Sequence, residues 1–213
     1  MDDLQAVAAL QDPVRRALYD FVAAQGRDVG RNEAAEAAGV QRTLAAFHLD
    51  KLVEAGLLDA RFKRLGERSG PGSGRPAKVY RRASAERSVS LPPRDYRTPA
   101  LVLADVVHLL GAEERAEEAA REAGARMARP PAPLEDVLRA RGYEPYHDGD
   151  RVRLRNCPFH VLSEEHPLLV CSMNLALCQG LLDGLGERGV TAVSDAAPGR
   201  CCVAFVASSP EDG

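Results

Sequence analysis

The chain of 213 residues has a net charge of −3 and an apolar content of 45%, which is typical of a soluble globular protein with one large domain or two small ones. The charge is uneven, because residues 1–95 carry 16 basic and 13 acidic groups (+3) and residues 96–213 carry 12 and 18 (−6). The longest apolar run, "TPALVLADVVHLLGA", is too short to cross a bilayer and contains Asp105 and His108. The N-terminal "MDDLQAV" lacks the basic region of a secretory signal, so we expect a cytoplasmic protein.

Three helices are predicted in the first 56 residues. Asp12 and Pro13 are typical of an N-cap and a first helical residue, and the helical spacing of apolar residues continues to about Gln25. A short helix is expected at about 32–38, and a longer one within "QRTLAAFHLDKLVEAGLL", where it ends at Gly56. The apolar face of the longer helix consists of Ala45, Leu49, Leu52 and Val53. A short helix, a tight glycine-containing turn and a longer helix together predict a helix-turn-helix.

A β-hairpin with a long basic tip is predicted after these helices. "LLDARFKRL" and "AKVYRRA" are typical of strands, and "GERSGPGSGRP" between them is too rich in Gly, Ser and Pro to form regular structure. Residues 60–82 contain eight basic groups and one acid, Glu67, a local charge of +7 that favours a polyanion as partner. The order of helix, turn, helix, strand, basic tip and strand predicts a winged helix over residues 1–84.

A winged helix binds duplex DNA through two parts of its surface. The first turn of the second helix of the helix-turn-helix reaches base edges in the major groove, where Arg42 is suited to a bidentate pair with guanine. Lys51 lies further along this helix and is expected to meet phosphate. The arginines of the wing are expected on the DNA backbone or in a minor groove. The predicted DNA-binding residues are Gln41, Arg42, Thr43, Lys51, Arg64, Arg68 and Arg75.

A second domain is predicted over residues 98–213, after a linker at 85–97 that contains two prolines. Helices are expected at about 98–110, 112–128, 133–141 and 166–186. A hairpin with its turn at "HDGD" and two strands, "VTAV" and "CCVAFVAS", supply an antiparallel sheet. The predicted fold class is therefore α+β, with a winged helix-turn-helix domain followed by an α+β sensor and dimerisation domain.

All five cysteines lie in the last 57 residues: Cys157, Cys171, Cys178, Cys201 and Cys202. Cytoplasmic thiols stay reduced, so these residues indicate a metal site, catalysis or core packing rather than a disulfide scaffold. Cys171 and Cys178 share one face of the predicted helix but are separated by about 10.5 Å along its axis, so they are not expected to hold one group together. Cys171 is nearer the helix N-terminus, where a thiolate is favoured. Cys201 and Cys202 are adjacent in a predicted strand, so only one of them is expected to face a site.

Two sets of motifs resemble a known family. "RTLAAFHLDKLVEAGLL" followed by "GPGSGRPAKVYRR" resembles the ArsR-like winged-helix regulators, and "CPF", "VCSMN" and "GRC" resemble the SufR-type iron–sulfur-dependent repressors of cluster-assembly operons. The resemblance implies a homodimer on an inverted-repeat operator in double-stranded DNA. It also implies an iron–sulfur cluster, with [4Fe-4S] favoured over [2Fe-2S], on the ligands Cys157, Cys171 and Cys201. The fourth ligand stays open between His160 and His166, and a histidine there would raise the reduction potential.

Two other functions remain open from the sequence. Cys157 and His160 have CxxH spacing, which would suit a zinc- or small-ligand-responsive regulator without a cluster. The same pair could serve a cysteine-dependent enzyme fused to a DNA-binding domain. The enzyme is the weakest hypothesis, because the sequence places no acid to orient the histidine and contains no phosphate-binding loop. We therefore expect a regulator rather than an enzyme.

Overall fold

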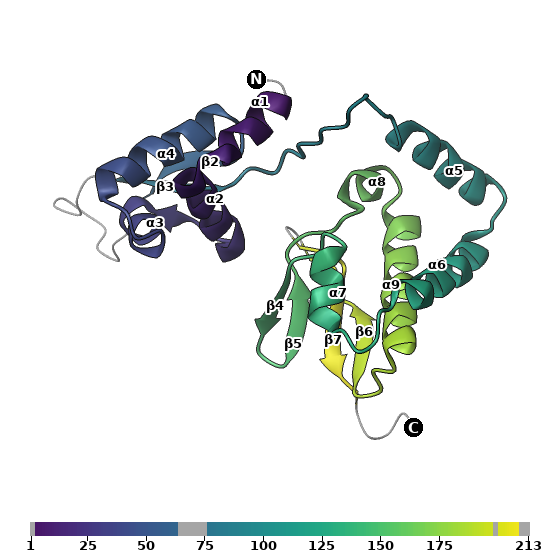
Figure 1. Ribbon diagram of the computed structural model, residues 1–213. Helices are drawn as coiled ribbons and strands as arrows, with labels where there is room; N and C mark the ends of the chain where they lie inside the picture. The colour runs from purple at the N-terminus through teal and green to yellow at the C-terminus, as the bar shows by residue number, and fades with distance from the viewer. Residues whose placement is uncertain (1–2, 64–75, 198–199, 209–213) are drawn as a thin grey trace. The chain divides into compact units, whose positions relative to one another are not determined.

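The computed structural model describes residues 3–63, 76–197 and 200–208. The chain forms two compact units, Met1–Arg94 and Asp95–Gly213, whose helices and strands are labelled in Figure 1. Each unit combines helices with an antiparallel sheet, which confirms the α+β class at that level.

The first unit has a three-stranded sheet in the order β1-β3-β2 beside its helices. Its elements are α1 (Asp3–Ala8), η1 (Ala9–Gln11), α2 (Pro13–Gln25), β1 (Val29–Gly30), α3 (Arg31–Ala37), α4 (Arg42–Glu54), β2 (Leu58–Lys63) and β3 (Ala77–Arg82). β3 pairs with both neighbours, with Tyr80 opposite Val29 on one side and opposite Ala60 on the other. The helices and strands predicted for this part of the chain are present within one or two residues of their expected ends.

The helix ends follow from local chemistry. Asp12 caps α2 by accepting a hydrogen bond from the backbone N–H of Arg15 at 2.9 Å, and Pro13 occupies the first helical position. The turn between α3 and α4 contains Gly39 at φ 64°, and α4 is followed by Gly56 at φ 67°. Both conformations are left-handed and favour glycine, so the predicted stops of these two helices are confirmed.

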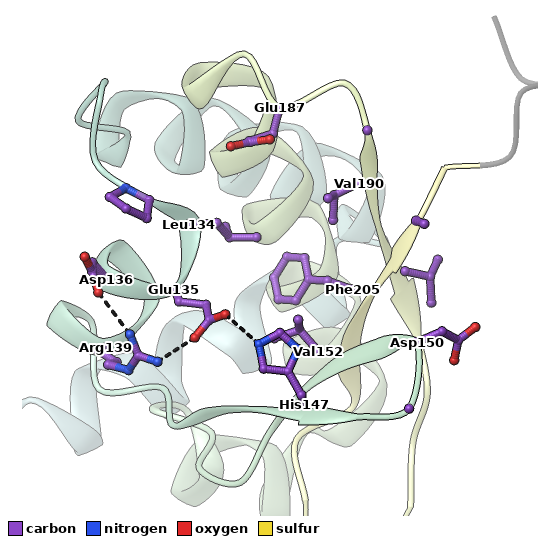
Figure 2. Close-up of a pocket in the computed structure, with 15 residues that line it drawn as sticks. Leu134, Glu135, Asp136, Arg139, His147, Asp150, Val152, Glu187, Val190 and Phe205 are labelled. Atoms are coloured by element: carbon purple, nitrogen blue, oxygen red, sulfur yellow. Dashed lines mark hydrogen bonds and ion pairs between the residues drawn. The ribbon is translucent and has the colours of Figure 1, made fainter.

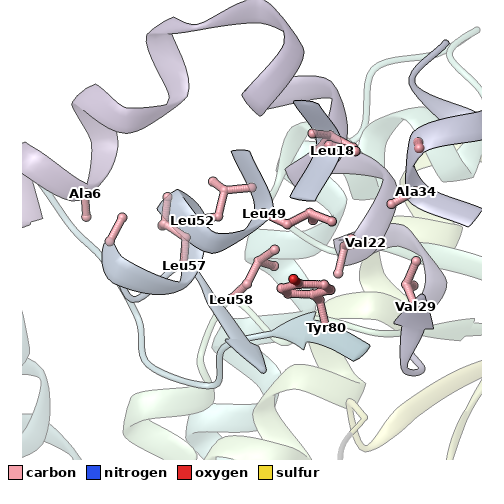
Figure 3. Packing of buried hydrophobic residues seen from close by; sticks show 13 residues of the cluster. Ala6, Leu18, Val22, Val29, Ala34, Leu49, Leu52, Leu57, Leu58 and Tyr80 are labelled. Atoms are coloured by element: carbon pink, nitrogen blue, oxygen red, sulfur yellow. The ribbon is translucent and has the colours of Figure 1, made fainter. Parts of the chain in front are cut away.

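The core of the first unit lies between α2, α4 and the sheet (Figure 3). Leu18 of α2, Leu49 of α4 and Tyr80 of β3 are fully buried there. The predicted apolar face of α4 is largely confirmed, since Ala45, Leu49 and Leu52 are buried and Val53 is half-buried. Burial of this face leaves the opposite side of α4 facing solvent.

A polar network fixes α4 to β3 at the edge of this core. Tyr80 is fully buried, but its hydroxyl donates to Asp50 Oδ1 at 2.7 Å and accepts from Arg31 Nε at 2.9 Å. Lys78 Nζ donates to the same carboxylate oxygen at 2.7 Å. Burial raises the pKa of Tyr80 to about 12, so its hydroxyl stays protonated and can donate at all physiological pH values.

The second unit has a four-stranded antiparallel sheet in the order β4-β5-β7-β6. Its elements are α5 (Arg97–Leu109), α6 (Glu113–Met127), α7 (Leu134–Ala140), β4 (Pro145–Asp148), β5 (Arg151–Leu154), α8 (His160–Glu165), α9 (Pro167–Leu185), β6 (Val190–Ser194) and β7 (Val203–Ala207). The predicted hairpin turn is confirmed, with Gly149 at φ 63° between β4 and β5. Helix α8 was not predicted, because six residues between two prolines carry too few apolar positions to show a helical period.

The last predicted strand begins later than expected. β7 starts at Val203, so Cys201 and Cys202 precede it, and the backbone bends at Cys202. The segment is still tied to the sheet, since the Cys201 N–H donates to the Leu154 carbonyl at 3.0 Å and the Cys202 carbonyl accepts from the Asp195 N–H at 2.7 Å. The regular alternation of side chains expected for a strand therefore does not apply to this pair.

Helix α9 is the central helix of the second unit. Gly124 of α6 and Gly180 of α9 lie where the two helices cross, and a Cβ at either position would overlap a backbone carbonyl of the other helix. Among the described residues, α9 is the one helix long and apolar enough to cross a membrane, but 44% of its most apolar window is buried. Leu181 and Leu182 of α9 belong to the core of the unit, so its apolar character is that of a core helix.

We expect the polar network around Asp50 to make the first unit sensitive to acid. Burial raises the pKa of Asp50, but hydrogen bonds from Lys78 and Tyr80 outweigh it, so the pKa lies below its ordinary value of 3.8. A carboxyl group with a lowered folded pKa stabilises the protein above its unfolded pKa and loses that contribution as pH falls through the folded value. Asp50→Asn should therefore reduce the free energy of unfolding at pH 7, by no more than about 1 kcal/mol because the carboxylate is 41% exposed and solvent screens its ion pairs.

Urea unfolding of the wild type and of Asp50→Asn between pH 7 and pH 3 tests this expectation. The difference between their free energies of unfolding should narrow as pH falls. Other carboxyl groups also titrate in this range, but they are common to both proteins and cancel in the difference. A difference that does not change with pH would show that Asp50 does not contribute through its charge.

Candidate functional site

The predicted major-groove residues lie on the exposed start of α4. Gln41 precedes the helix, Arg42 and Thr43 are its first two residues, and all three are exposed. Arg42 makes no hydrogen bond or ion pair with any described residue, so its guanidinium group is available. Lys51 is also exposed, but its Nζ lies 2.6 Å from Glu54 Oε2, which partly neutralises it.

Two large apolar side chains extend this exposed surface of α4. Leu44 and Phe47 are 42% and 54% exposed, although most apolar residues of the unit are buried. Apolar side chains in a recognition helix contact the methyl group of thymine. The exposed start of α4 thus combines an uncommitted arginine with apolar groups, a combination suited to base edges.

Several basic groups of the predicted hairpin are already paired. Arg61 Nη2 and Lys63 Nζ both contact Asp28 Oδ2, at 2.5 and 3.1 Å, and the Asp28 side chain is only 7% exposed. Lys78 is paired with Asp50. Three of the eight basic groups of residues 60–82 thus form ion pairs with acidic residues outside this segment. The positive electrostatic potential of the segment is therefore weaker than its charge of +7 implies. The wing residues Arg64, Arg68 and Arg75 lie outside the described residues.

Four cysteines line one cavity of about 390 Å³ in the second unit. They come from three segments, since Cys157 follows β5, Cys171 lies in the second turn of α9, and the adjacent pair Cys201 and Cys202 precedes β7. The lining residues are Cys157, His160, Ser163, Cys171, Ala196, Ala197, Arg200, Cys201 and Cys202. The fold thus brings the three predicted ligands to one place, together with a fourth thiol that was expected to face away.

The four thiols line the cavity close enough to influence one another's pKa. The interaction with the Cys201 thiol and the N–H of Phe159 lower the pKa of Cys157, in spite of its burial. Burial raises the pKa of Cys171 to about 11, and the neighbouring Cys157 raises that of Cys201 to about 11. The pKa of Cys171 is thus raised rather than lowered, so its surroundings do not favour the thiolate expected at the start of α9.

Cys178 lies outside this cavity. It is fully buried in the core, its Sγ lies 3.9 Å from Asn174 Oδ1, and burial raises its pKa to about 12. The helical rise between Cys171 and Cys178 places the two thiols in different surroundings. Cys178 thus behaves as a packing residue.

Asn174 is a site residue that the sequence analysis did not single out. Its side chain is 2% exposed, accepts a hydrogen bond from the Tyr143 hydroxyl at 2.5 Å, and donates Nδ2–H to Cys201 Sγ at 3.3 Å. The signal was present in "VCSMN", where an asparagine interrupts an otherwise apolar helix. A buried amide in such a helix requires partners, and here one of them is a cysteine of the cavity.

The remaining polar residues of the cavity are Arg200 and His160. Arg200 Nη2 lies 3.5 Å from Asp195 Oδ1, whereas its Nε is buried and has no partner among the described residues. His160 is 63% exposed and faces Glu164, with Nε2 3.6 Å from Oε1. The other predicted candidate, His166, is absent from the lining and lies 3.2 Å from Asp105. A backbone hydrogen bond joins the His160 N–H to the Cys157 carbonyl at 3.1 Å, but no hydrogen bond among the described residues joins the Cys157 thiol to the His160 ring.

The thiols of the cavity do not converge on one point. The described parts of the chain contain no group of three His, Cys, Asp or Glu side chains close enough to hold a metal ion. An iron–sulfur cluster holds its thiolates on separate iron atoms, so its ligands line a volume rather than meet at a point. The cavity supplies residue types that such a cluster requires, since its lining contains four cysteines and Arg200, whose buried Nε–H has no partner among the described residues.

A larger cavity of about 550 Å³ lies between α7 and the sheet (Figure 2). Leu134, Val152 and Phe205 form part of its apolar lining. Its charged residues pair with one another, since Glu135 contacts both His147 and Arg139, at 3.0 and 2.5 Å. It contains no cysteine and none of the predicted ligands, so it does not compete with the cysteine cavity as the metal site.

Comparison of the chain with protein-family models, with curated proteins and with solved structures gives no significant match.

We expect Cys157 to be the most reactive thiol of the metal-free protein, because a lowered pKa increases its thiolate fraction at neutral pH. Iodoacetamide at pH 7, under anaerobic conditions and with a chelator, should label Cys157 before the other four cysteines, as measured by mass spectrometry of peptides. Cys201→Ala removes one hydrogen-bond donor and should slow this labelling. Cys178→Ala is the matched control and should leave the rate unchanged; equal rates in all three proteins would contradict the proposed hydrogen bond.

Proposed function

We propose that this protein is a DNA-binding transcriptional regulator, acting as a repressor, whose operator binding is controlled by a redox-sensitive iron–sulfur cluster in the cysteine cavity. The observation that carries the proposal is the convergence of Cys157, Cys171 and Cys201, from three segments of the second unit, on one cavity. Their positions are those at which the SufR-type resemblance implies ligands. By this resemblance, the regulated genes would include those of iron–sulfur cluster assembly.

The first unit would supply DNA binding as a winged helix-turn-helix. In support, α3 and α4 are joined by a tight turn at Gly39 and are followed by the antiparallel strands β2 and β3. The exposed Arg42 would read guanine, with Gln41 and Thr43 beside it. The wing arginines would contact the backbone and make affinity dependent on salt.

The second unit would hold the cluster and contribute to a homodimer. When bound, the cluster would supply a group whose oxidation or loss reports the redox state. The chain's own residues prepare the cavity: Asn174 orients Cys201 by donating to its sulfur, and Arg200 places positive charge beside the thiolates. The helix α5 has no buried residue and exposes large apolar side chains, and a second copy of the chain is the partner we propose for it. These side chains are Val102, Leu103, Val106 and Leu109.

Arg42→Ala tests the DNA-binding part of this proposal. Loss of one bidentate base contact should reduce discrimination between a selected duplex and random DNA by about 1–3 kcal/mol. Arg16→Ala is the control, because Arg16 is another exposed arginine of the same unit and lies on α2 rather than α4. Binding isotherms for a duplex selected by the wild-type protein from a random pool provide the measurement, and equal discrimination in both variants would exclude Arg42 from base recognition.

Anaerobic purification tests the cluster. We expect a coloured protein with iron and acid-labile sulfide in equal amounts, and we expect Cys157→Ser, Cys171→Ser and Cys201→Ser to lose them, because a serine hydroxyl is a poor ligand for iron in such clusters. Cys178→Ser is the control, since it replaces the other cysteine of α9, which is buried in the core and lies outside the cavity. A colourless wild-type protein with stoichiometric zinc would instead support the zinc-responsive regulator.

A further inference from the structure

The cavity contains one cysteine that neither the resemblance nor the strand pattern assigns to the site. Cys202 lines the cavity beside the three predicted ligands, whereas a regular strand would have turned it away. The displacement of β7 to Val203 and the bend at Cys202 account for this position.

We propose that Cys202 is the fourth ligand, so that the cluster is held by four thiolates and by neither histidine. The proposal rests on the iron–sulfur function stated above and concerns how the cluster is completed. The site would then consist of Cys157, Cys171, Cys201 and Cys202.

The two adjacent cysteines are anchored on different partners. Cys201 Sγ accepts a hydrogen bond from Asn174 Nδ2 at 3.3 Å, whereas Cys202 Sγ lies 3.9 Å from the carbonyl oxygen of Cys171. Cys201 is 4% exposed and is part of the core, and Cys202 is half-buried beside α9. The pair therefore presents two thiols at separate places along the cavity wall, as two iron atoms of one cluster require.

Neither histidine has a comparable position. His166 lies beside Asp105 and does not line the cavity, and His160 lines it with a side chain that is 63% exposed and faces Glu164. Cys202 lines the cavity, and its Sγ lies 3.9 Å from the carbonyl oxygen of Cys171. A thiolate is also the softer ligand, which iron–sulfur sites select.

Four thiolates have two consequences for the site. Each iron of a [4Fe-4S] cluster would have a protein ligand, so no iron would be open to exchange. The negative charge of the cluster with its ligands would be larger than with a histidine. Arg200 lines the same cavity and would offset part of this charge, and its buried Nε has no partner within the described residues. The reduction potential should consequently be lower than that of a site with one histidine.

Alkylation of the wild-type protein, with and without its cluster, tests the proposal without a variant that might misfold. The protein is reconstituted anaerobically with ferrous iron and sulfide, treated with iodoacetamide, and mapped by fragment-ion mass spectrometry, which separates Cys201 from Cys202. We expect the cluster to protect both residues of the pair as well as Cys157 and Cys171, and to leave the labelling of Cys178 unaffected. Labelling of Cys202 at equal rates in the two states would overturn the proposal.

Iron content of three variants completes the test. Cys202→Ser should lose iron or retain a cluster with altered electron paramagnetic resonance, whereas Cys178→Ser and His160→Gln should keep the wild-type iron content and spectrum. Loss with His160→Gln and retention with Cys202→Ser would assign the histidine instead and overturn this proposal while the cluster stands. A wild-type protein that binds no iron under these conditions would overturn the proposed function, and this proposal with it.

Discussion

The buried amide of Asn174 is the interaction on which the cysteine cavity depends. It joins the helix α9 to the Tyr143 hydroxyl on one side and to the Cys201 sulfur on the other. Leaving a buried donor or acceptor without its partner costs about 1–3 kcal/mol, so α9 cannot shift along the sheet without breaking one of these bonds. Because α9 also carries Cys171, this single residue sets the distance between the helix and the segment that contains Cys201 and Cys202.

A similar constraint orients the surface of the first unit for which we propose DNA binding. The Tyr80 hydroxyl and Lys78 Nζ meet at Asp50 in the middle of α4, which fixes the rotation of this helix relative to β3. Its apolar face is then buried and the side with Arg42 and Phe47 is exposed. In both units a buried or half-buried polar group specifies how one helix is placed, while apolar packing supplies most of the stability.

Local signals in the sequence predicted much of the fold. The start of α2 was predictable because Asp12 caps a backbone N–H three residues away and Pro13 suits the first helical position. The end of α4 was predictable because Gly56 favours a left-handed conformation. The start of β7 was not, because "CCVAFV" is uniformly apolar and the Cys201 N–H bonds to the carbonyl of Leu154, which is distant in the chain. The pairing of Arg61 and Lys63 with Asp28 spans more than thirty residues, so no sequence window could reveal that these charges are partly neutralised.

The candidate site was predicted only in part for the same physical reason. Spacing alone left Cys201 and Cys202 as alternatives, since a strand period allows only one of them on each face. The structure places both thiols on one cavity because the chain there is not a strand, and it places His166 elsewhere because α8 and the start of α9 direct it toward Asp105. Asn174 was overlooked because a single amide in an apolar helix does not change the helical period of apolar residues. Its two buried hydrogen bonds, to Tyr143 and Cys201, nevertheless join the helix to the cavity.

The protonation of the thiols explains how one set of residues can serve both as core and as a metal site. Cys171 and Cys201, each with a pKa of about 11, are neutral at pH 7, and a neutral thiol packs as a small apolar group. Cys201 is accordingly part of the core of its unit. The proposed metal cluster would reverse this preference, because its positive iron atoms would stabilise thiolates and release the protons. Loading of the cluster should therefore weaken as pH falls, and Cys157, whose pKa is lowered, is the thiol of the cavity that should lose its proton most readily.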